Sequence, residues 1–339
     1  MRGRMVGDTV AIIGVGLIGG SVGLALRQRQ LARRVVGIVR RSETVADLVQ
    51  RGIVSEATTD LAHGVHGADF IVVCTPVDSI ARYVLEAARH ASAHAVITDA
   101  GSTKGRIVAE VESAWAELVN QRSPGQATIM ATGGESPPSE SEAASPLAET
   151  PAGLRPPLLT YQSLLAGVSL PKTACRFVGS HPLAGSEKSG YQFADPQLLV
   201  GRWVVVTPTD RSEARATERI VAFWQALGAR VQLMAPEDHD RALAMTSHLP
   251  HLVASALAGM LPLKWADLAA SGFRDTTRIA AGPPEIWTPI FLHNRPALLE
   301  ALTEFEARLC LFRQALETEN ADALSALLAQ GKARRESLS

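Results

Sequence analysis

The sequence predicts an α/β domain with a doubly wound parallel sheet, followed by a domain built only of helices. Short apolar runs alternate with amphipathic stretches over the first half of the chain. This is the pattern of a parallel sheet covered by helices on both faces. A long polar stretch then breaks the alternation, and after residue 236 the pattern becomes wholly helical.

The first half contains four apolar runs with the length and composition of buried strands. They lie at residues 10–13, 34–39, 69–74 and 95–99. A stretch with helical periodicity follows each run, at residues 17–27, 42–50, 77–90 and 103–118. Because repeated strand–helix units connect parallel strands by crossovers, we expect these runs to form one parallel sheet.

Residues 120–171 interrupt this pattern. The segment is rich in Gly, Pro, Ser, Glu and Ala, and residues 133–140 have almost no apolar side chains. Such a composition cannot bury enough apolar surface to offset the entropy of ordering the chain. We expect a disordered insertion, with a short helix at residues 158–165.

Order is expected to return at residues 175–179. Further elements are predicted after it, namely strands at 203–207 and 230–234 with a helix over 213–227 between them. These strands should extend the sheet. Long helices are then expected at 238–260, 296–316 and 321–335, the first of them interrupted at Pro250. The chain therefore divides into a sheet domain at 1–235, which contains the insertion, and a helical domain at 236–339.

The composition excludes several classes of protein. With 33 basic and 34 acidic residues the formal net charge is −1, without the basic excess of nucleic-acid-binding domains. Cys74, Cys175 and Cys310 have no metal-ligand spacing, and an odd number of cysteines suits a reducing compartment. The apolar run near the start is too short for a signal peptide or a membrane span. We predict a cytoplasmic protein that contacts neither nucleic acid nor membrane and holds no metal.

A glycine-rich turn, Gly14-Val15-Gly16-Leu17-Ile18-Gly19, joins the first predicted strand to the first predicted helix. In a dinucleotide-binding turn the first glycine makes the tight turn and the second lets the pyrophosphate approach. The third lets helix and strand pack closely. The phosphates then meet free N–H groups, those of Leu17 and Ile18 included, at the positive end of the helix dipole. We predict a Rossmann-type domain that binds a nicotinamide dinucleotide; a tight turn without a ligand is the alternative.

The end of the second predicted strand distinguishes NADP from NAD. NAD-binding domains usually place Asp or Glu there to bind the ribose 2′-hydroxyl. Here Arg40 and Arg41 follow the strand, and no acid occurs before Glu43, which suits a 2′-phosphate. We predict NADP in preference to NAD, although the arginines could instead begin a solvated helix or stack on adenine. Thr75 and Pro76, which end the third predicted strand, are further candidates for contact with the cofactor.

Two segments place polar groups at the ends of predicted strands. Residues 99–105 follow a carboxyl end, where ligands bind in such folds. Ser102 there could cap the next helix, bind substrate, or do both. His181 follows a predicted strand among the glycines and small polar residues of 179–190. That setting suits a general base with a pKa near working pH, although a lone loop histidine is more often structural.

Two more segments lie in the helical half. The first carries three polar side chains spaced to share a helix face, which we expect to contact substrate: Asp240, Ser247 and His251. The second, residues 272–278, carries Arg274 and Arg278 near a glycine. Arginine binds a substrate carboxylate well, but either side chain could instead pair with Asp275.

Taken together and in this order, these segments resemble the prephenate and arogenate dehydrogenase family of tyrosine biosynthesis. The more specific parts of the resemblance are His-Pro-Leu-Ala-Gly at 181–185 and Phe-Arg-Asp-Thr-Thr-Arg at 273–278. The glycine turn and three further segments also match, namely Cys74-Thr75-Pro76, residues 99–104 and Ser247-His248-Leu249-Pro250-His251. The resemblance extends over most of the chain.

The resemblance implies oxidative decarboxylation of prephenate to 4-hydroxyphenylpyruvate, or alternatively of arogenate to tyrosine, with NADP or NAD. By this likeness His181 is the base for the ring C4 hydroxyl, and Ser102 hydrogen-bonds to that hydroxyl. The implied substrate contacts are Arg274 on a carboxylate, His251 near the side chain, and Ser186 and Glu187 at the pocket mouth. The helical part would form a homodimer and contribute to the pocket. His251 and the Ser186-Glu187 pair favour prephenate.

Two other classes of protein fit less well. A β-hydroxyacid dehydrogenase would use a catalytic lysine in a glycine-rich helix, whereas Lys264 lacks neighbouring glycines. A catalytically silent NADP-sensing protein would not need the combination of His181, Ser102 and Arg274.

Overall fold

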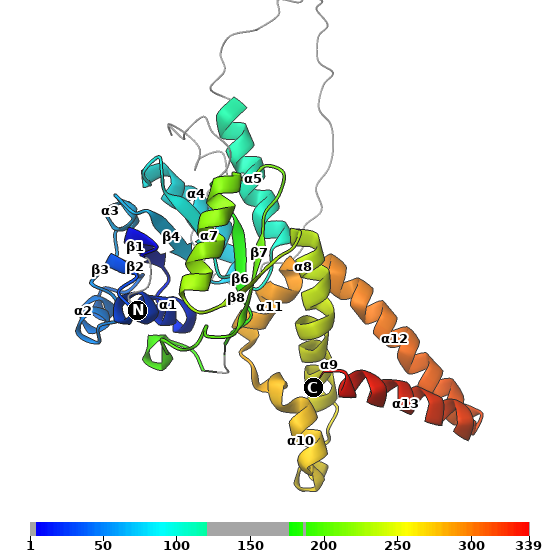
Figure 1. Ribbon diagram of the computed structural model, residues 1–339. Helices are drawn as coiled ribbons and strands as arrows, with labels where there is room; N and C mark the ends of the chain where they lie inside the picture. Colours follow the sequence, from blue (N-terminus) through cyan, green and yellow to red (C-terminus); the bar gives the residue numbers. More distant parts are fainter. Residues whose placement is uncertain (1–4, 121–175, 186–187, 339) are drawn as a thin grey trace, which may run out of the picture.

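The computed structural model describes residues 5–120, 176–185 and 188–338. The predicted insertion from residue 121 onward, the predicted helix at 158–165, Ser186 and Glu187 therefore lie outside the described residues. A sheet domain occupies one end of the molecule, and helices extend from it at the other (Figure 1).

The N-terminal half folds into the predicted parallel sheet, with the strand order β3-β2-β1-β4-β5. The strands are β1 (Gly7–Ile13), β2 (Ala32–Ile38), β3 (Glu56–Thr58), β4 (Phe70–Val73) and β5 (Val96–Asp99). The helices that follow them are α1 (Leu17–Gln28), α2 (Glu43–Gln50), α3 (Leu61–Val65), α4 (Val77–His90) and α5 (Gly105–Asn120). The prediction missed β3 and α3, because three and five residues are too few to show a period.

Both faces of this sheet are buried, which explains why its strands are apolar throughout. One apolar cluster includes Ile71 of β4 and Trp115 of α5. The other includes Phe70 of β4 and Phe223 of α7 (Ala214–Ala226), whose rings stack with centroids 5.2 Å apart. The strand order reverses between β1 and β4, and the carboxyl ends of the strands at such a point are where ligands bind.

A second sheet of three strands continues from the first. It has the order β6-β7-β8, with β6 (Gly179–Pro182) antiparallel to β7 (Trp203–Thr207) and β7 parallel to β8 (Arg230–Leu233). A parallel bridge between Ile97 of β5 and Phe177 links the two sheets. These strands therefore extend the sheet, as expected from their apolar runs.

His181 lies inside β6 and not beyond the end of a strand, so the predicted position of this strand was wrong. After the bridge at Phe177, the ladder with β5 stops, because the Asp99 carboxylate accepts the Ser180 N–H at 3.0 Å. The chain then pairs with β7, and His181 lies opposite Val205.

The C-terminal part begins with an almost continuous helical run. It consists of α8 (Pro236–Leu243), the π-helical turn η2 (Ala244–His248) and α9 (Leu249–Gly259). The predicted interruption at Pro250 is instead this π-helical turn just before it. Pro250 itself lies in the first turn of α9, directly after the π-helical turn. Turns of this kind are frequent at functional sites.

The remaining elements include η1 (Tyr191–Phe193) in the sheet domain and six in the helical part. Those six are η3 (Leu263–Leu268), α10 (Ser271–Thr277), η4 (Arg278–Ala281), α11 (Pro284–His293), α12 (Arg295–Glu317) and α13 (Ala321–Glu336). A small core around Ala244, Leu249, Leu298 and Ala301 joins α9 to α12. Among the described residues, no helix is both long and apolar enough to cross a membrane.

Candidate active site

The glycine turn lies between β1 and α1, at the carboxyl edge of the five-stranded sheet. Gly14 has a φ of 90°, which favours glycine, and a Cβ there would lie 2.7 Å from the Cys74 carbonyl oxygen. A Cβ on Gly19 would lie 2.3 Å from the Gly14 carbonyl oxygen. A Cβ on Gly16 would meet nothing within 4 Å. Gly14 and Gly19 are therefore needed by the fold, whereas Gly16 leaves the backbone open to a ligand.

The surroundings of the turn fit the pyrophosphate of a dinucleotide. α1 has neither a side-chain cap nor an acidic residue in its first turn. The N–H groups of that turn, where Leu17 and Ile18 lie, are therefore available to an anion. Thr75 packs beside Gly14, and its buried hydroxyl has no hydrogen-bond partner among the described residues. Pro76 follows it and directly precedes α4.

Arg40 and Arg41 stand at the same edge of the sheet. They follow β2, whose last residue Ile38 accepts the Gly14 N–H at 3.0 Å. Both arginine side chains are exposed, and Arg41 Nε lies 3.7 Å from a carboxylate oxygen of Glu43. Two cations thus flank the position where such folds bind the adenosine ribose.

Asp99 ends β5 and joins the two predicted catalytic segments. One carboxylate oxygen accepts the Gly101 N–H at 2.8 Å, and the other accepts the Ser180 N–H at 3.0 Å. Ser102 follows the first of these residues and His181 follows the second. A single buried carboxylate therefore fixes the turn that carries the hydroxyl relative to the strand that carries the imidazole.

Lys104 neutralises Asp99 inside the protein. The ammonium and the carboxylate form an ion pair, and neither side chain is accessible to solvent. Burial lowers the pKa of Lys104, and the negative charge of Asp99 opposes that shift. Loss of either partner would leave an uncompensated buried charge, so this pair is required for the geometry of the site.

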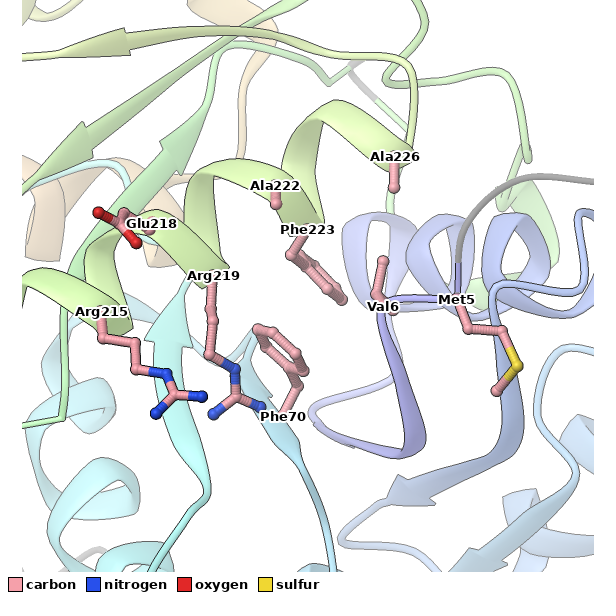
Figure 2. A pocket seen from close by; sticks show the side chains of 9 residues that line it. All are labelled: Met5, Val6, Phe70, Arg215, Glu218, Arg219, Ala222, Phe223 and Ala226. Carbon is pink, nitrogen blue, oxygen red and sulfur yellow. The ribbon is translucent and has the colours of Figure 1, made fainter.

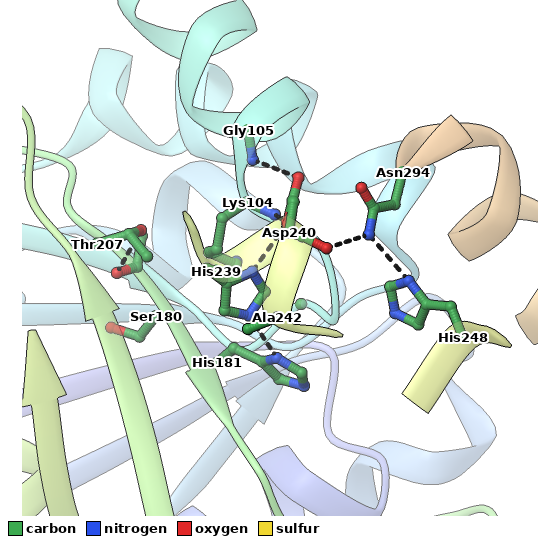
Figure 3. Close-up of polar contacts among 12 residues, drawn as sticks. Lys104, Gly105, Ser180, His181, Thr207, His239, Asp240, Ala242, His248 and Asn294 are labelled. Carbon is green, nitrogen blue, oxygen red and sulfur yellow. Dashed lines mark hydrogen bonds and ion pairs between the residues drawn. The ribbon is translucent and has the colours of Figure 1, made fainter. Parts of the chain in front are cut away.

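His181 belongs to a chain of hydrogen-bonded side chains that crosses from the sheet to the helical part (Figure 3). Its Nδ1 lies 2.8 Å from Nε2 of His239, and Nδ1 of His239 lies 2.8 Å from Oδ1 of Asp240. His239 and Asp240 are buried residues of α8. The first helix of the helical part therefore contacts the predicted base directly.

The Asp240 carboxylate, which helix spacing placed at the substrate, is engaged by groups of the protein itself. Its Oδ1 accepts the Lys104 N–H and its Oδ2 accepts the Gly105 N–H, each at 2.8 Å. With His239 also on Oδ1, both oxygens are occupied, and the side chain caps α5. Ser102 is therefore not the cap of α5; its half-buried hydroxyl forms no hydrogen bond with the described residues.

The histidines of this cluster are held neutral. Burial lowers the pKa of His181 well below its ordinary value of 6.5, and the neighbouring His239 and Lys104 lower it further. Burial also lowers the pKa of His239, and it lowers that of His248 to about 4. His181 is therefore unprotonated at neutral pH, the state in which an imidazole can accept a proton.

Ser247 and His251 lie further along the same helical run. Ser247 is half-buried in η2. His251 stacks on Trp287, with ring centroids 3.6 Å apart and an angle of 13° between the planes. The His251 Nδ1 is buried and has no hydrogen-bond partner among the described residues.

The structure does not bring Arg274 to His181. Arg274 lies on α10, at the outer end of the helical part and away from β6 (Figure 1). Its side chain is exposed, and its Nε donates to the Ala269 carbonyl oxygen at 2.9 Å. In the described part of the chain it forms no ion pair with Asp275.

Arg278 belongs to the segment that leads to His251. It is exposed and begins η4, which packs against α9. η4 leads to Gly282, where a Cβ would lie 2.9 Å from Cε1 of His251. The turn that begins at Arg278 therefore ends at a glycine that lies close to the His251 ring.

Sequence reasoning missed the roles of His239 and Trp287. His239 directly precedes Asp240 in a segment that we single out, and this adjacency was the available signal. It was not used, because neighbouring helix residues do not normally face one site. Nothing in the sequence around Trp287 indicated its contact with His251, because that contact depends on how α11 packs against the rest of the protein.

Two family models match the chain. The model described as "Prephenate dehydrogenase, nucleotide-binding domain" matches residues 22–122 and 168–233. The model described as "Prephenate dehydrogenase, dimerization domain" matches residues 235–330. The chain belongs to the prephenate dehydrogenase family. It is accordingly a nicotinamide-dependent dehydrogenase.

Relatives in the prephenate dehydrogenase family align over most of the chain. Prephenate dehydrogenase of Bacillus subtilis is 28% identical over 339 residues, covering 98% of this chain and 76% of the relative. Cyclohexadienyl dehydrogenase of Zymomonas mobilis is 29% identical, covering 93% of this chain and 90% of the relative.

Solved structures of the family have the same fold. Prephenate dehydrogenase from A. aeolicus, in complex with hydroxyphenyl propionate and NAD+, superposes with a TM-score of 0.75 at 27% identity, covering 98% of both chains. Synechocystis arogenate dehydrogenase superposes with a TM-score of 0.70 at 26% identity, covering 98% of this chain and 100% of the other.

A hollow of about 440 Å³ lies beside the amino-terminal end of β4, at the edge of the sheet opposite to the glycine turn (Figure 2). Phe70, Phe223 and Arg219 are among its lining residues. Arg219 stacks over Phe70 at 4.6 Å and donates to the carbonyl oxygens of Asp69 and His94. These contacts hold α7 on the sheet, and none of them connects the hollow to the chain of side chains around His181.

Proposed function

We propose that this dehydrogenase catalyses the oxidative decarboxylation of prephenate to 4-hydroxyphenylpyruvate. The observation that carries the proposal is the position of His181. It is a neutral imidazole, hydrogen-bonded through Nδ1 and tied by Asp99 to the turn that carries Ser102. Membership of the family and the named relatives support the same activity.

The chemistry assigns a task to each of these groups. Prephenate carries a hydroxyl on ring C4, a ring carboxylate and a pyruvyl side chain. Nε2 of His181 takes the proton of the C4 hydroxyl, and the Ser102 hydroxyl bonds to the same oxygen. When bound, the nicotinamide ring accepts hydride from C4. The ring carboxylate leaves as CO2, its bonding electrons complete the aromatic ring as a phenolate, and His181 returns the proton to that oxygen. Aromatisation drives the step.

The remaining site residues would hold the substrate. Nδ1 of His251, which has no partner among the described residues, would bond to the side chain of prephenate. Ser247, which lies in η2 before α9, is a further proposed contact. Arg274 and Arg278 are the cations that we propose for the substrate carboxylates. Ser186 and Glu187 remain proposed residues of the pocket mouth.

Arogenate is the alternative substrate, since it differs from prephenate only by an amino group in place of the side-chain ketone. We favour prephenate because His251 and the Ser186-Glu187 pair resemble prephenate-using members of the family, and relatives that align over most of the chain are named prephenate dehydrogenase. A neutral imidazole by itself serves either substrate, since one of its nitrogens donates and the other accepts.

We propose NADP as the preferred cofactor, on the basis of Arg40 and Arg41 beside the glycine turn. Gly14, Gly16, Leu17, Ile18 and Gly19 would hold the pyrophosphate, with Thr75 and Pro76 beside them. An exposed guanidinium matches the charge and the acceptor geometry of a 2′-phosphate.

We also propose a homodimer formed by the helical part. Large apolar side chains are left in solvent there, with Met260, Leu263 and Leu268 exposed by 77%, 92% and 78%. Such surfaces usually mark an interface, and the family model for this segment is described as a dimerization domain. Light scattering of the purified protein tests the proposal, with twice the mass of one chain as the expected result.

The activity is tested by following the absorbance of reduced nicotinamide with the two substrates and the two cofactors in all four combinations. We expect the highest kcat/KM with prephenate and NADP. Higher kcat/KM with arogenate would transfer the proposal to that substrate. Absence of reduction with both substrates would overturn it.

A further inference from the structure

We infer that His239 and Asp240 are positioning residues that lock His181 in one tautomer, with Nδ1 protonated and Nε2 free to accept a proton. The inference rests on the proposed function only for what Nε2 does to a substrate. The tautomer itself follows from the hydrogen-bonded chain of the described residues.

The first step concerns Asp240, whose surroundings require a carboxylate. Its two oxygens face three groups, the N–H of Lys104, the N–H of Gly105 and Nδ1 of His239. The two backbone groups can only donate. Burial opposes ionisation of Asp240, but the Lys104 and Gly105 N–H groups, one on each oxygen, stabilise the carboxylate, and the pKa of Asp240 lies below its ordinary value.

The second step concerns His239, because the Asp240 carboxylate fixes which ring nitrogen of His239 carries the hydrogen. An ionised carboxylate can only accept, so Nδ1 of His239 must carry the hydrogen. The opposite tautomer would set the lone pair of Nδ1 against a carboxylate oxygen at 2.8 Å. Burial lowers the pKa of His239, so the ring is neutral at pH 7 and its Nε2 holds a lone pair.

The third step sets the tautomer of His181. Nε2 of His239 is an acceptor and lies 2.8 Å from Nδ1 of His181. Nδ1 of His181 must therefore donate, and in a neutral ring this leaves Nε2 without a hydrogen. Nε2 is the nitrogen that is not bonded to α8, so the lone pair of the base is directed away from this chain of side chains.

The titratable groups around His181, His239 and Asp240 are compatible with this tautomer of His181. Lys104, whose backbone bonds to Asp240, directs its ammonium to Asp99 and not to either imidazole. His248 lies on the other side of α8, where Asn294 donates to the Asp240 carbonyl oxygen at 2.7 Å and lies 3.0 Å from His248 Nδ1. Asp240 is thus held from its backbone as well as from its side chain.

Through Asp240, α8 positions both the His181 ring and the turn that carries Ser102. Through His239 the Asp240 carboxylate fixes the tautomer of His181, and through Lys104 and Gly105 it holds the end of the turn that carries Ser102. The helical part therefore prepares the base and the hydroxyl before any substrate binds.

Two substitutions at one position test the role of His239. In His239→Gln the amide oxygen can accept from His181 and the amide nitrogen can donate to Asp240, which reproduces the polarity of the imidazole. His239→Leu fills the site but can do neither. We expect His239→Leu to lower kcat roughly 10- to 100-fold, the size of the loss when the orienting partner of a metal-bound histidine is removed. The KM for prephenate and cofactor binding should change little, and His239→Gln should recover most of the loss.

A spectroscopic measurement tests the tautomer without any substrate. With ¹⁵N-labelled histidine, the ring nitrogens of His181 are assigned by comparison with His181→Asn, and their chemical shifts report which one is protonated. We expect a protonated Nδ1 and a bare Nε2 in the full-length protein, and mixed tautomers in His239→Leu. A bare Nδ1 in the unsubstituted protein overturns the inference even if prephenate is turned over.

Two kinetic outcomes would also overturn the inference. One is near-full kcat in His239→Leu, and the other is equal loss in the Gln and Leu variants, which would indicate a role in shape alone. If the predicted tautomer is observed but neither prephenate nor arogenate reacts, the proposed function fails while the positioning role stands.

Discussion

His181 and His239 come from different parts of the fold, yet Nδ1 of the first lies 2.8 Å from Nε2 of the second. The strand β6 supplies one ring and the helix α8 supplies the other. Their contact directs the free nitrogen of His181 away from α8, and this makes His181 the first target for testing.

Replacement of His181 by Asn should remove the base while keeping a polar side chain of smaller size. We expect kcat with prephenate to fall by about two to four orders of magnitude, the usual contribution of a positioned general base. The dissociation constant of the cofactor, measured by fluorescence titration, should be unchanged, since the glycine turn lies on other elements. Near-full kcat in this variant would show that another group is the base.

The pH profile of kcat/KM should reflect the buried setting of His181. The pKa of His181 is held well below 6.5 by burial and by the neighbouring His239 and Lys104. Because the unprotonated ring is the active form, activity should stay constant as the pH falls from about 8 to about 6.5 and should decline only below that. An acid limb centred at or above the ordinary histidine pKa would contradict the assignment.

Two glycine substitutions should separate cofactor binding from folding. Gly16→Ala adds a methyl group where nothing lies within 4 Å, so the thermal midpoint of unfolding should not change, while cofactor affinity should fall at least about tenfold. Gly19→Ala places a Cβ 2.3 Å from a backbone oxygen and should cost roughly 1–3 kcal/mol of stability. Unchanged cofactor affinity in Gly16→Ala would argue against pyrophosphate at this turn.

Arg278 and Arg274 can be ranked by kinetics. Arg274 uses its Nε on the Ala269 carbonyl oxygen, whereas η4 leads from Arg278 to the wall of His251. We expect Arg278→Ala to raise the KM for prephenate about tenfold or more, as loss of a charged hydrogen bond does, with a smaller effect of Arg274→Ala. A larger effect of Arg274→Ala would restore the ranking that the sequence suggested.

The preference for NADP can be tested at the end of β2. The double substitution Arg40→Ala with Arg41→Ala should weaken NADP binding by roughly 10- to 100-fold and leave NAD binding nearly unchanged, because only NADP carries the 2′-phosphate. Arg33→Ala is the matched control, since this arginine is also exposed but lies toward the other end of β2. Equal losses for both cofactors would indicate contacts with a group that they share.

Much of the fold could be predicted from the sequence because it is encoded locally. The apolar runs correspond to β1, β2, β4 and β5, and the predicted helix at residues 77–90 has the bounds of α4. Short elements such as β3 and the 3₁₀ turns around α10 could not be predicted, because they contain too few residues for a period. The position of β6 was missed for another reason, since the Asp99 carboxylate replaces a backbone partner there.

For the candidate site, too, some features could be predicted from the sequence and others could not. The segments that carry the glycine turn, Ser102 and His181 stand out in the sequence because small and polar residues gather in each of them, although His181 lies inside β6 and not after a strand. Asp240 was expected at the substrate from its spacing along a helix, and the structure shows its carboxylate on the N–H groups of Lys104 and Gly105. Spacing along a helix does not fix which way the helix faces in the protein. The role of Arg274 at the substrate stays a prediction.

By itself, the sequence determined that a dinucleotide-binding sheet precedes a helical part, because hydrophobic periodicity and the glycine turn depend on neighbouring residues. Only the tertiary structure decided what surrounds His181. His239 lies 58 positions from it, and the Asp99 carboxylate bonds to a residue 81 positions away. Such hydrogen bonds depend on how a strand and a helix are placed against each other, and no local pattern records that placement.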